Sequence, residues 1–195
     1  MKTLVIHPDD RSTDFLRAIY SALPDTKVLT HDVSRRDLIE QILEHDQIIA
    51  CGHGTPGGLL NVANIGTGAY SISNEDAFYL RNKRFIAIWC NADQYIKYNQ
   101  LNALYSGMFI SEPREARMYN IYVDDNLINE SNKAFSIILG HHLKTNTTLS
   151  QTYPMLKEAY AEVAKNNPVA KFNWDRLYLT EDKSMLGLQD SVTYI

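Results

Sequence analysis

The chain has 195 residues, of which 45% are hydrophobic and 22% are charged, a composition typical of a globular protein with one sizeable core. Its formal net charge of −4 comes from interspersed charges, which argues against a basic surface for nucleic acid or an anionic membrane. Neither a signal-peptide core nor a membrane-spanning apolar run is present, so we expect a cytoplasmic protein that does not span a membrane. The sequence has no repeat or linker, which predicts a single domain over residues 1–195.

Strands and helices alternate in the first ninety residues. Buried apolar runs predict four strands, at 3–6, 27–30, 47–51 and 84–90. Apolar residues at helical spacing predict two amphipathic helices, one at 11–23 and one that begins after the capping residue Ser34 and continues through Leu43. Between the third and fourth strands we expect a β-hairpin formed by GLLNV (58–62) and AYSIS (69–73), followed by a short helix capped by Ser73.

The second half of the chain is predicted to contain two strands and two helices. The strands are expected at 107–111 and 175–179, and the helices at 126–144 and 150–165. Nearly continuous apolar strands that alternate with helices are typical of a parallel sheet covered on both faces. The predicted fold is therefore an α/β three-layer sandwich with a mainly parallel sheet of about six strands.

A histidine and a cysteine follow two of these strands. His53 comes just after the third strand, within Gly-His-Gly, and Cys90 ends the fourth strand. The loops at the carboxyl ends of parallel strands form a crevice where functional groups collect. If the two strands are neighbours, imidazole and thiol come within reach and supply the base and the nucleophile of a thiol acyl-transfer site. Gly52 and Gly54 let the backbone turn sharply beside that site.

Three stretches carry a resemblance to a known group of enzymes. They are IIACGHG, GGLLNV through AYSISNEDAFYL, and FIAIWCNAD, and the resemblance covers residues 1–112 in the order of the elements. A hydrophobic strand ending in His-Gly, a Gly-rich hairpin with a helix, and a hydrophobic strand ending in cysteine are similar to the caspase-like cysteine peptidases. That group includes caspases, metacaspases, legumain, gingipain, clostripain, separase and the CHAT domains.

The resemblance implies a caspase-like fold and a cysteine-dependent peptide-bond hydrolase that acts on a peptide or protein substrate. By the same likeness His53 and Cys90 form the catalytic dyad, and the backbone N–H groups of Gly54 and Cys90 form the oxyanion hole. The chain departs from the group at Trp89, where many members have a small residue, and we expect this ring to pack under a helix. No phosphate loop or dinucleotide fingerprint is present, so no organic cofactor is expected.

Acidic side chains beside the dyad would favour Arg or Lys in the substrate. Asp93, three residues after the cysteine, and Glu112, after the predicted fifth strand, are the candidates for such a pocket. Alternatively, Asp93 caps a helix and Glu112 faces water. Asp9 and Asp10 follow the first strand, where an acid could orient an imidazole, although capping of the next helix is the simpler interpretation.

Three alternatives stay open at this point. A caspase-like fold can serve as a catalytically inactive binding or regulatory module, because a fold does not establish an activity. Cys51 could be the nucleophile of a thiol enzyme similar to the intracellular-protease and amidotransferase-like family, although a hairpin rather than a helix is predicted after it. Cys51, His53, Cys90 and Asp93 could also ligate zinc, but their spacing matches no structural zinc motif, so no metal site is predicted.

Overall fold

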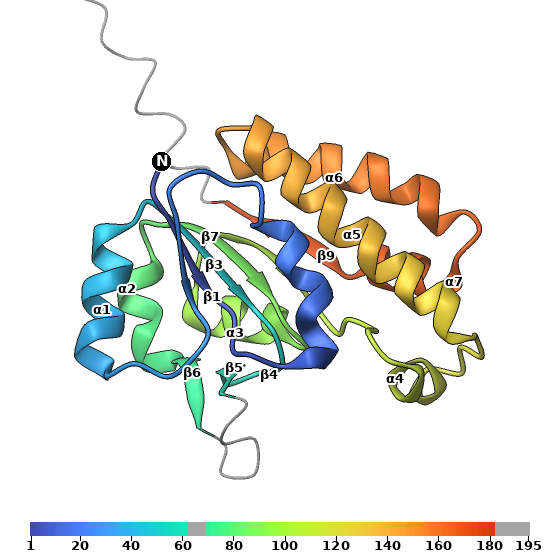
Figure 1. Cartoon of the computed structure of the whole chain (residues 1–195), viewed down its shortest axis with the longest axis horizontal. Helices are drawn as coiled ribbons and strands as arrows, with labels where there is room; N and C mark the ends of the chain where they lie inside the picture. The colour runs from blue at the N-terminus through green and yellow to red at the C-terminus, as the bar shows by residue number, and fades with distance from the viewer. Residues whose placement is uncertain (62–68, 182–195) are drawn as a thin grey trace, which may run out of the picture.

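A six-stranded sheet lies at the centre of the protein (Figure 1). The computed structural model describes residues 1–61 and 69–181. The strand order is β2-β1-β3-β7-β8-β9, and all neighbouring pairs are parallel except β8 with β9. The strands are β1 (Thr3–Ile6), β2 (Thr26–Leu29), β3 (Gln47–Cys51), β7 (Arg84–Ile88), β8 (Ala103–Ser106) and β9 (Leu177–Thr180). The predicted α/β class with a mainly parallel sheet of about six strands is confirmed.

Helices cover both faces of the sheet (Figure 1). One face is covered by α1 (Arg35–Glu44), α2 (Ala77–Leu80) and α3 (Ala92–Asn99). The other is covered by the 3-10 helix η1 (Arg11–Ile19), α5 (Asp125–Thr145) and α6 (Leu149–Ala164). A separate cluster of buried apolar side chains fills each interface, an arrangement compatible with a three-layer sandwich.

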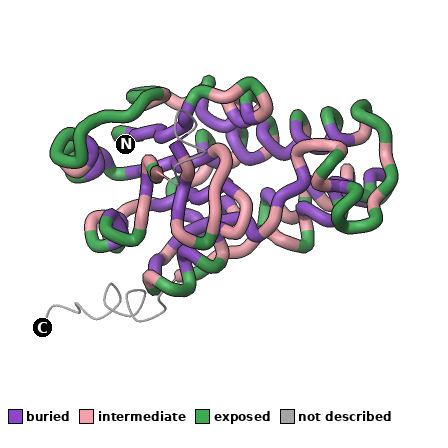
Figure 2. Tube along the Cα trace, turned by 90° about the horizontal axis from the view of Figure 1, so that it is seen from below, coloured by how far each residue is buried: buried purple, intermediate pink, exposed green. Residues whose placement is uncertain are grey.

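Alternate residues of each strand face opposite cores. In β3, Ile48 and Ala50 pack in the cluster under α1, α2 and α3, whereas Ile49 and Cys51 pack in the cluster under η1, α5 and α6. All four side chains are fully buried. Figure 2 shows buried residues along the centre of the molecule and exposed ones on the outer turns. Because both faces of the sheet are covered, its strands are continuous apolar runs, which explains why the sequence locates them.

A smaller antiparallel sheet follows β3. It consists of β4 (Gly54–Thr55), β5 (Gly58–Leu60) and β6 (Tyr70–Ser73), in that order. The predicted pairing of the two patches is therefore confirmed, while Val62 and the connection through residue 68 lie outside the described residues. Ser73 and Asp76 then form the expected capping box of the short helix η3 (Asn74–Asp76), which continues into α2.

Two predicted elements end earlier than expected. The helix expected at 11–23 is the 3-10 helix η1, which ends at Ile19. The strand expected at 84–90 ends at Ile88. The Trp89 carbonyl leaves the ladder and accepts the Ser106 hydroxyl at 3.0 Å, so the chain has already turned where the thiol appears.

The strand predicted at 107–111 is wrong. The fifth strand is β8, which ends at Ser106, and the apolar residues after it leave the sheet. The amide of Asn173 replaces a strand partner here, because its Oδ1 accepts the Ile110 N–H at 2.7 Å and its Nδ2 donates to the Ile110 carbonyl at 2.9 Å. A distant side chain therefore satisfies backbone groups that the sequence pattern assigns to a sheet.

The last part of the chain is largely helical. α5 and α6 match the predicted long helices to within one residue at each end, and β9 matches the expected last strand. Two further helices, α4 (Pro113–Met118) and α7 (Pro168–Asp175), were not predicted. Within the described residues, no helix has both the length and the apolar character needed to cross a bilayer.

The contact between α5 and η1 predicts a cost for a single added methyl group. A Cβ on Gly140 would lie 2.6 Å from the Ala18 carbonyl oxygen and 2.8 Å from that of Ile19, so the backbone of η1 or α5 must shift. Such overpacking costs about 1–3 kcal/mol, which exceeds the gain of about 1 kcal/mol from replacing a helical glycine. We expect Gly140→Ala to lower the free energy of unfolding in urea.

The exposed Asn129, on the same helix, provides the control. Asn129→Ala should leave stability unchanged or slightly higher, because alanine favours the helix and nothing packs on this position. A Gly140→Ala protein as stable as the control would show that η1 and α5 are not in close backbone contact.

Candidate active site

The pairing of β3 with β7 brings His53 and Cys90 to one edge of the sheet. The two strands are parallel neighbours, with Cys51 opposite Ile88. His53 lies two residues after the end of β3, and Cys90 two residues after the end of β7. Both side chains line the same small cavity, of about 20 Å³. Among the described residues no hydrogen bond joins the imidazole to the thiol, so their catalytic roles stay a prediction.

This edge is also the place where the order of the strands reverses. The chain passes from β1 to β2 on one side and then returns to β3 on the other side of β1. At such a point a crevice is expected between the loops that follow β1 and β3. The loop after β1 carries Asp10, Ser12 follows in the first turn of η1, and the loop after β3 carries His53.

Ser12 and Asp10 orient the imidazole of His53. The Ser12 hydroxyl donates to Asp10 Oδ1 at 2.7 Å, and its oxygen lies 2.7 Å from His53 Nε2. The pKa of Asp10 is lowered, mainly by the hydrogen bond from the Ser12 side chain, so Asp10 acts only as an acceptor. Because the single hydroxyl proton is used on the carboxylate, the serine oxygen accepts from Nε2–H, which leaves Nδ1 as the proton acceptor of a neutral imidazole.

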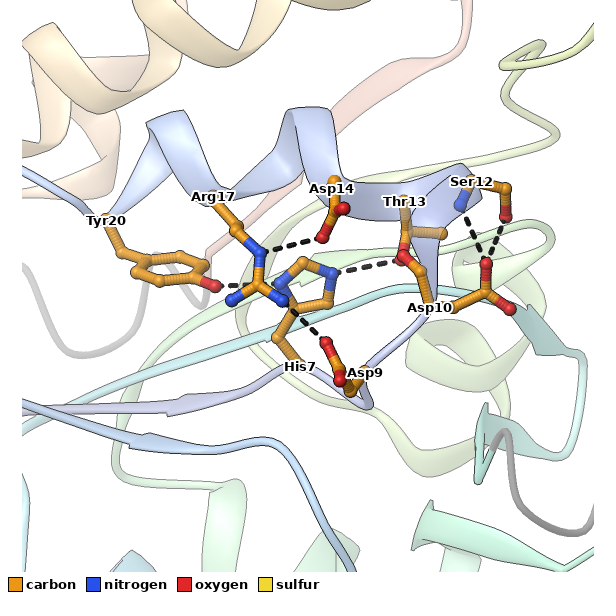
Figure 3. A network of polar contacts seen from close by, with 8 residues as sticks. All are labelled: His7, Asp9, Asp10, Ser12, Thr13, Asp14, Arg17 and Tyr20. Carbon is orange, nitrogen blue, oxygen red and sulfur yellow. Dashed lines mark hydrogen bonds and ion pairs between the residues drawn. The ribbon is translucent and has the colours of Figure 1, made fainter.

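A buried network fixes the loop that carries these groups. Figure 3 shows the side chains that surround His7 at the start of η1. The Thr13 hydroxyl donates to the Asp10 carbonyl and accepts from His7 Nε2 at 3.1 Å, and the Tyr20 hydroxyl donates to His7 Nδ1 at 2.8 Å. Asp10 also accepts the Ser12 N–H as the N-cap of η1, so the capping interpretation is confirmed. Asp10 therefore both caps the helix and, through Ser12, contacts the imidazole.

Cys90 has different surroundings. Its thiol donates to the Phe109 carbonyl at 3.5 Å and lies 4.0 Å from Glu115 Oε1. The pKa of the Cys90 thiol is raised to about 11, mainly by burial and also by the carboxylates of Glu115 and Glu112, while the bond to the Phe109 carbonyl opposes them. The thiol is therefore protonated at neutral pH in this conformation.

Trp89 packs away from the thiol, under α3. Its ring meets Tyr95 in an edge contact with centroids 5.4 Å apart, and its Nε1 donates to the Thr55 carbonyl at 3.2 Å. The expected packing under a helix is confirmed. A Cβ at Gly54 would lie 2.0 Å from the indole, so only glycine fits where β4 crosses this ring. Gly54 and Cys90 flank the same edge, and their oxyanion-hole role stays a prediction.

The structure places neither of the two expected pocket acids in the lining of the cavity. Asp93 lies in the first turn of α3, where it pairs with Lys97 at 3.1 Å and does not cap the helix. Glu112 is the N-cap of α4. Among the described residues the cavity is lined by neither acid, so a substrate role for them has no geometric support. Glu115, which the sequence reasoning missed, is the acid nearest the thiol.

Two residues at this edge were missed, and each has a local sequence signal. Ser12 stands two residues after Asp10, the spacing of a side chain that bonds a helix cap. Glu115 stands three residues after Glu112, with Pro113 between them at the first helical position, which is the pattern of a capped helix start. These signals identify two helix starts, although neither indicates which strand end lies beside them.

Cys51 is separated from the candidate site. It is fully buried in β3, on the side of η1 and α5, and burial raises its pKa far above the ordinary value. A hairpin follows it, so the strand-to-helix turn of the amidotransferase-like alternative is absent from this described stretch. In the described part of the chain, no group of three or more His, Cys, Asp or Glu side chains is placed to hold a metal ion.

Comparisons of the chain with protein-family models, with curated proteins and with solved structures give no match. Geometry therefore defines the class: an α/β protein with a mainly parallel sheet and a candidate His-Cys site at the carboxyl edge of its central strands.

The buried His7 predicts a pH dependence of folding. Burial, with help from the charge of Arg17, lowers the pKa of His7 from 6.5 to about 4. Between pH 4 and pH 6.5 the unfolded chain binds a proton that the folded protein excludes. The stabilisation that the neutral, buried His7 contributes is therefore complete above pH 6.5 and is lost as the pH falls to 4. The difference corresponds to about 3 kcal/mol.

We therefore expect the stability advantage of the wild type over His7→Gln, measured by urea denaturation, to shrink by that amount between pH 7 and pH 4. Asn129→Ala, which removes no titratable group, should differ from the wild type by a constant amount over the same range. A constant difference for His7→Gln as well would contradict a neutral, buried His7.

The contact with Ser12 predicts a single tautomer of His53. In the wild type, ¹⁵N chemical shifts of the ring at pH 8 should place the proton on Nε2, because the serine oxygen accepts it. In Ser12→Ala this acceptor is lost, and a mixture of tautomers is expected. Ser12→Thr keeps a hydroxyl and serves as the control; an identical tautomer in Ser12→Ala would show that the serine does not orient the ring.

Proposed function

We propose that the protein is a cysteine-dependent peptide-bond hydrolase with a caspase-like fold. His53 is the base and proton donor, and Cys90 is the nucleophile. The observation that carries this proposal is the shared cavity: the two side chains come from the ends of neighbouring parallel strands and line the same small space. The proposed substrate is a peptide or a protein.

The order of the elements supports the caspase-like part of the proposal. β3 leads into the loop of His53, a small antiparallel sheet and the helix α2 follow, and β7 leads to Cys90. This is the succession of elements on which the resemblance rests. His53 and Cys90 follow the ends of β3 and β7, the two strand ends on which the resemblance rests.

In the proposed reaction the thiol proton of Cys90 passes to Nδ1 of His53 while the sulfur attacks the carbonyl carbon of the scissile bond. The imidazolium then gives its proton to the leaving amine, the C–N bond breaks, and a thioester forms. Water attacks the thioester with His53 as base, which releases the acid and restores the thiol. A neutral thiol in the resting protein is compatible with this scheme, because the imidazole removes its proton during the attack.

Backbone donors hold the oxyanion in this proposal. The N–H groups of Gly54 and Cys90 are the proposed donors, and the loss of one donor of this kind raises the barrier by about 3 kcal/mol. The indole of Trp89, packed on Gly54, gives this strand a fixed position. The proposed role of Trp89 is therefore structural: it holds one wall of the site.

A second candidate function is a caspase-like binding module without activity. It is favoured by the protonated state of Cys90 and by a cavity of about 20 Å³, near the size of one water molecule. The two candidates differ in the dependence of thiol reactivity on His53. An active dyad needs the imidazole, whereas an inert buried cysteine reacts at the same rate without it.

The proposal predicts specific losses of activity against a mixed peptide library. Cys90→Ala should abolish cleavage, and His53→Ala should reduce it by about 100-fold or more, the usual contribution of a general acid–base. Product formation is measured by mass spectrometry, and folding by circular dichroism. Labelling of Cys90 by a peptide-like thiol probe at pH 7 should fall in His53→Ala in parallel.

Matched controls are available for both residues. Cys51→Ala removes the other cysteine, and His31→Ala removes an exposed histidine, so cleavage should persist in both. Equal cleavage by wild type and Cys90→Ala would reject the hydrolase. Labelling that is independent of His53, in a protein without cleavage, would favour the binding module.

A further inference from the structure

One segment borders the thiol side of the cavity. Residues 111–118, from Ser111 through α4, run from the cavity wall to the rim of the molecule, where Figure 1 shows α4 outside the main helical layers. Ser111 lines the cavity itself, and Glu115 faces the Cys90 thiol from α4. We call this stretch the covering segment.

The carboxylate of Glu115 joins the covering segment into one unit. Its Oε2 accepts the N–H groups of Ser111 at 2.7 Å and of Glu112 at 3.2 Å, and it also accepts the Ser111 hydroxyl. Its Oε1 is turned toward Cys90. The Glu115 side chain therefore both stabilises the conformation of the segment and contacts the thiol.

Residues 109–110, just before the covering segment, have more buried apolar surface than most of the segment itself. Phe109, before the covering segment, packs its ring against Phe135 with centroids 4.8 Å apart, and Ile110 is bonded on both backbone groups to Asn173. Within the segment only Ala116 is buried, and Met118 is largely exposed; the segment is anchored by the packing of Ala116 on Ile128 and by Asn132, whose Nδ2 donates to the Ser111 carbonyl at 3.0 Å. Segments with little buried apolar surface open locally at lower cost than the core does.

The cavity leaves no room for a substrate while the covering segment is in place. Its volume of about 20 Å³ holds about one water molecule, whereas ligand pockets in proteins usually measure about 300–1,000 Å³. The Phe109 carbonyl occupies one side of the sulfur and the Glu115 carboxylate another. The cavity beside the half-buried Cys90 is therefore too small to hold a scissile peptide bond in this conformation.

We propose that the covering segment is an autoinhibitory latch, in which Glu115 holds the Cys90 thiol shut and must move away before a peptide can reach it. This inference rests on the proposed function, since it describes how that site becomes accessible. The groups that face the thiol are His53 across the cavity, the Phe109 carbonyl, and the carboxylates of Glu115 and Glu112. Removing the charge of Glu115 should therefore release the thiol proton more readily.

The first test is the reactivity of Cys90 in Glu115→Gln. Glutamine keeps the size of the side chain and one acceptor oxygen but removes the charge next to the sulfur. We expect alkylation of Cys90 by iodoacetamide at pH 8, followed by peptide mapping, to be about 3- to 10-fold faster than in the wild type, because the thiolate is the reactive form.

Asp93→Asn is the matched control, since Asp93 is an acid close in sequence that pairs with Lys97 instead. Its rate should stay within about 2-fold of the wild type, the level expected when no charge facing the sulfur is lost. An unchanged rate in Glu115→Gln, or an equal rise in the control, would overturn the latch.

The second test uses the unaltered sequence and does not depend on how a variant folds. An N-ethylmaleimide adduct on Cys90 is larger than the cavity, so the latch predicts that the covering segment is displaced in the labelled protein. Amide hydrogen exchange across 111–118 should become at least about 10-fold faster in the adduct, with β7 unchanged, as expected for local opening. Equal protection of the segment in labelled and unlabelled protein would reject the latch.

Neither readout measures peptide cleavage, so the two proposals can fail separately. Faster thiol reaction in Glu115→Gln without any peptide cleavage would reject the hydrolase and support a latch over a reactive thiol. Cleavage that depends on Cys90, with no effect of Glu115 on thiol reactivity or exchange, would support the hydrolase and reject the latch.

Discussion

The candidate site depends on the register of two neighbouring strands. β3 and β7 run parallel with Ala50 opposite Ala87, so the chain leaves both strands at the same edge of the sheet. A shift by one residue would exchange the two faces of either strand. Both faces are packed, since Ile48 and Ile49 of β3 are fully buried in opposite cores. The packing of the sheet therefore also sets the spacing of His53 and Cys90.

The imidazole depends on contacts with a distant part of the chain as well. Ser12 reaches His53 from η1, and η1 lies directly on α5, where Gly140 permits a backbone approach that any side chain would prevent. On its inner side η1 is tied to β1 through His7, Thr13 and the Asp10 carbonyl. The orientation of one ring is thus fixed by a helix held between the sheet and α5, far beyond the loop that carries His53.

The parts that could be predicted from the sequence are those whose signal is local. The strand at 47–51 and the helix at 126–144 are apolar patterns long enough to show their own periodicity, and both are present. The strand predicted at 107–111 fails because Asn173 bonds the backbone of Ile110 in place of a neighbouring strand. Such a partner comes from tertiary structure, which no local pattern reveals.

The same difference between local and tertiary signals explains why only some residues of the candidate site could be predicted from the sequence. His53 and Cys90 stand next to strand ends, so the order of the strands was enough to suggest that they meet. Asp10 was recognised as a helix cap, yet its contact with His53 passes through Ser12 and needs the spatial approach of two loops. Glu115 belongs to a helix that was not predicted, so its position beside the thiol could not be inferred.

The two halves of the proposed dyad are prepared to different degrees. The hydrogen bonds that link Asp10, Ser12 and His53 engage Nε2 of the imidazole and leave Nδ1 able to accept a proton. Cys90, by contrast, is half-buried beside a carbonyl and a carboxylate, surroundings that hold a thiol protonated. An inert core cysteine would need no oriented imidazole, and an open active site would not place an acid against its nucleophile. The proposed latch accounts for both features. The base is already oriented, and the thiol would become accessible when residues 111–118 adopt a second, open conformation.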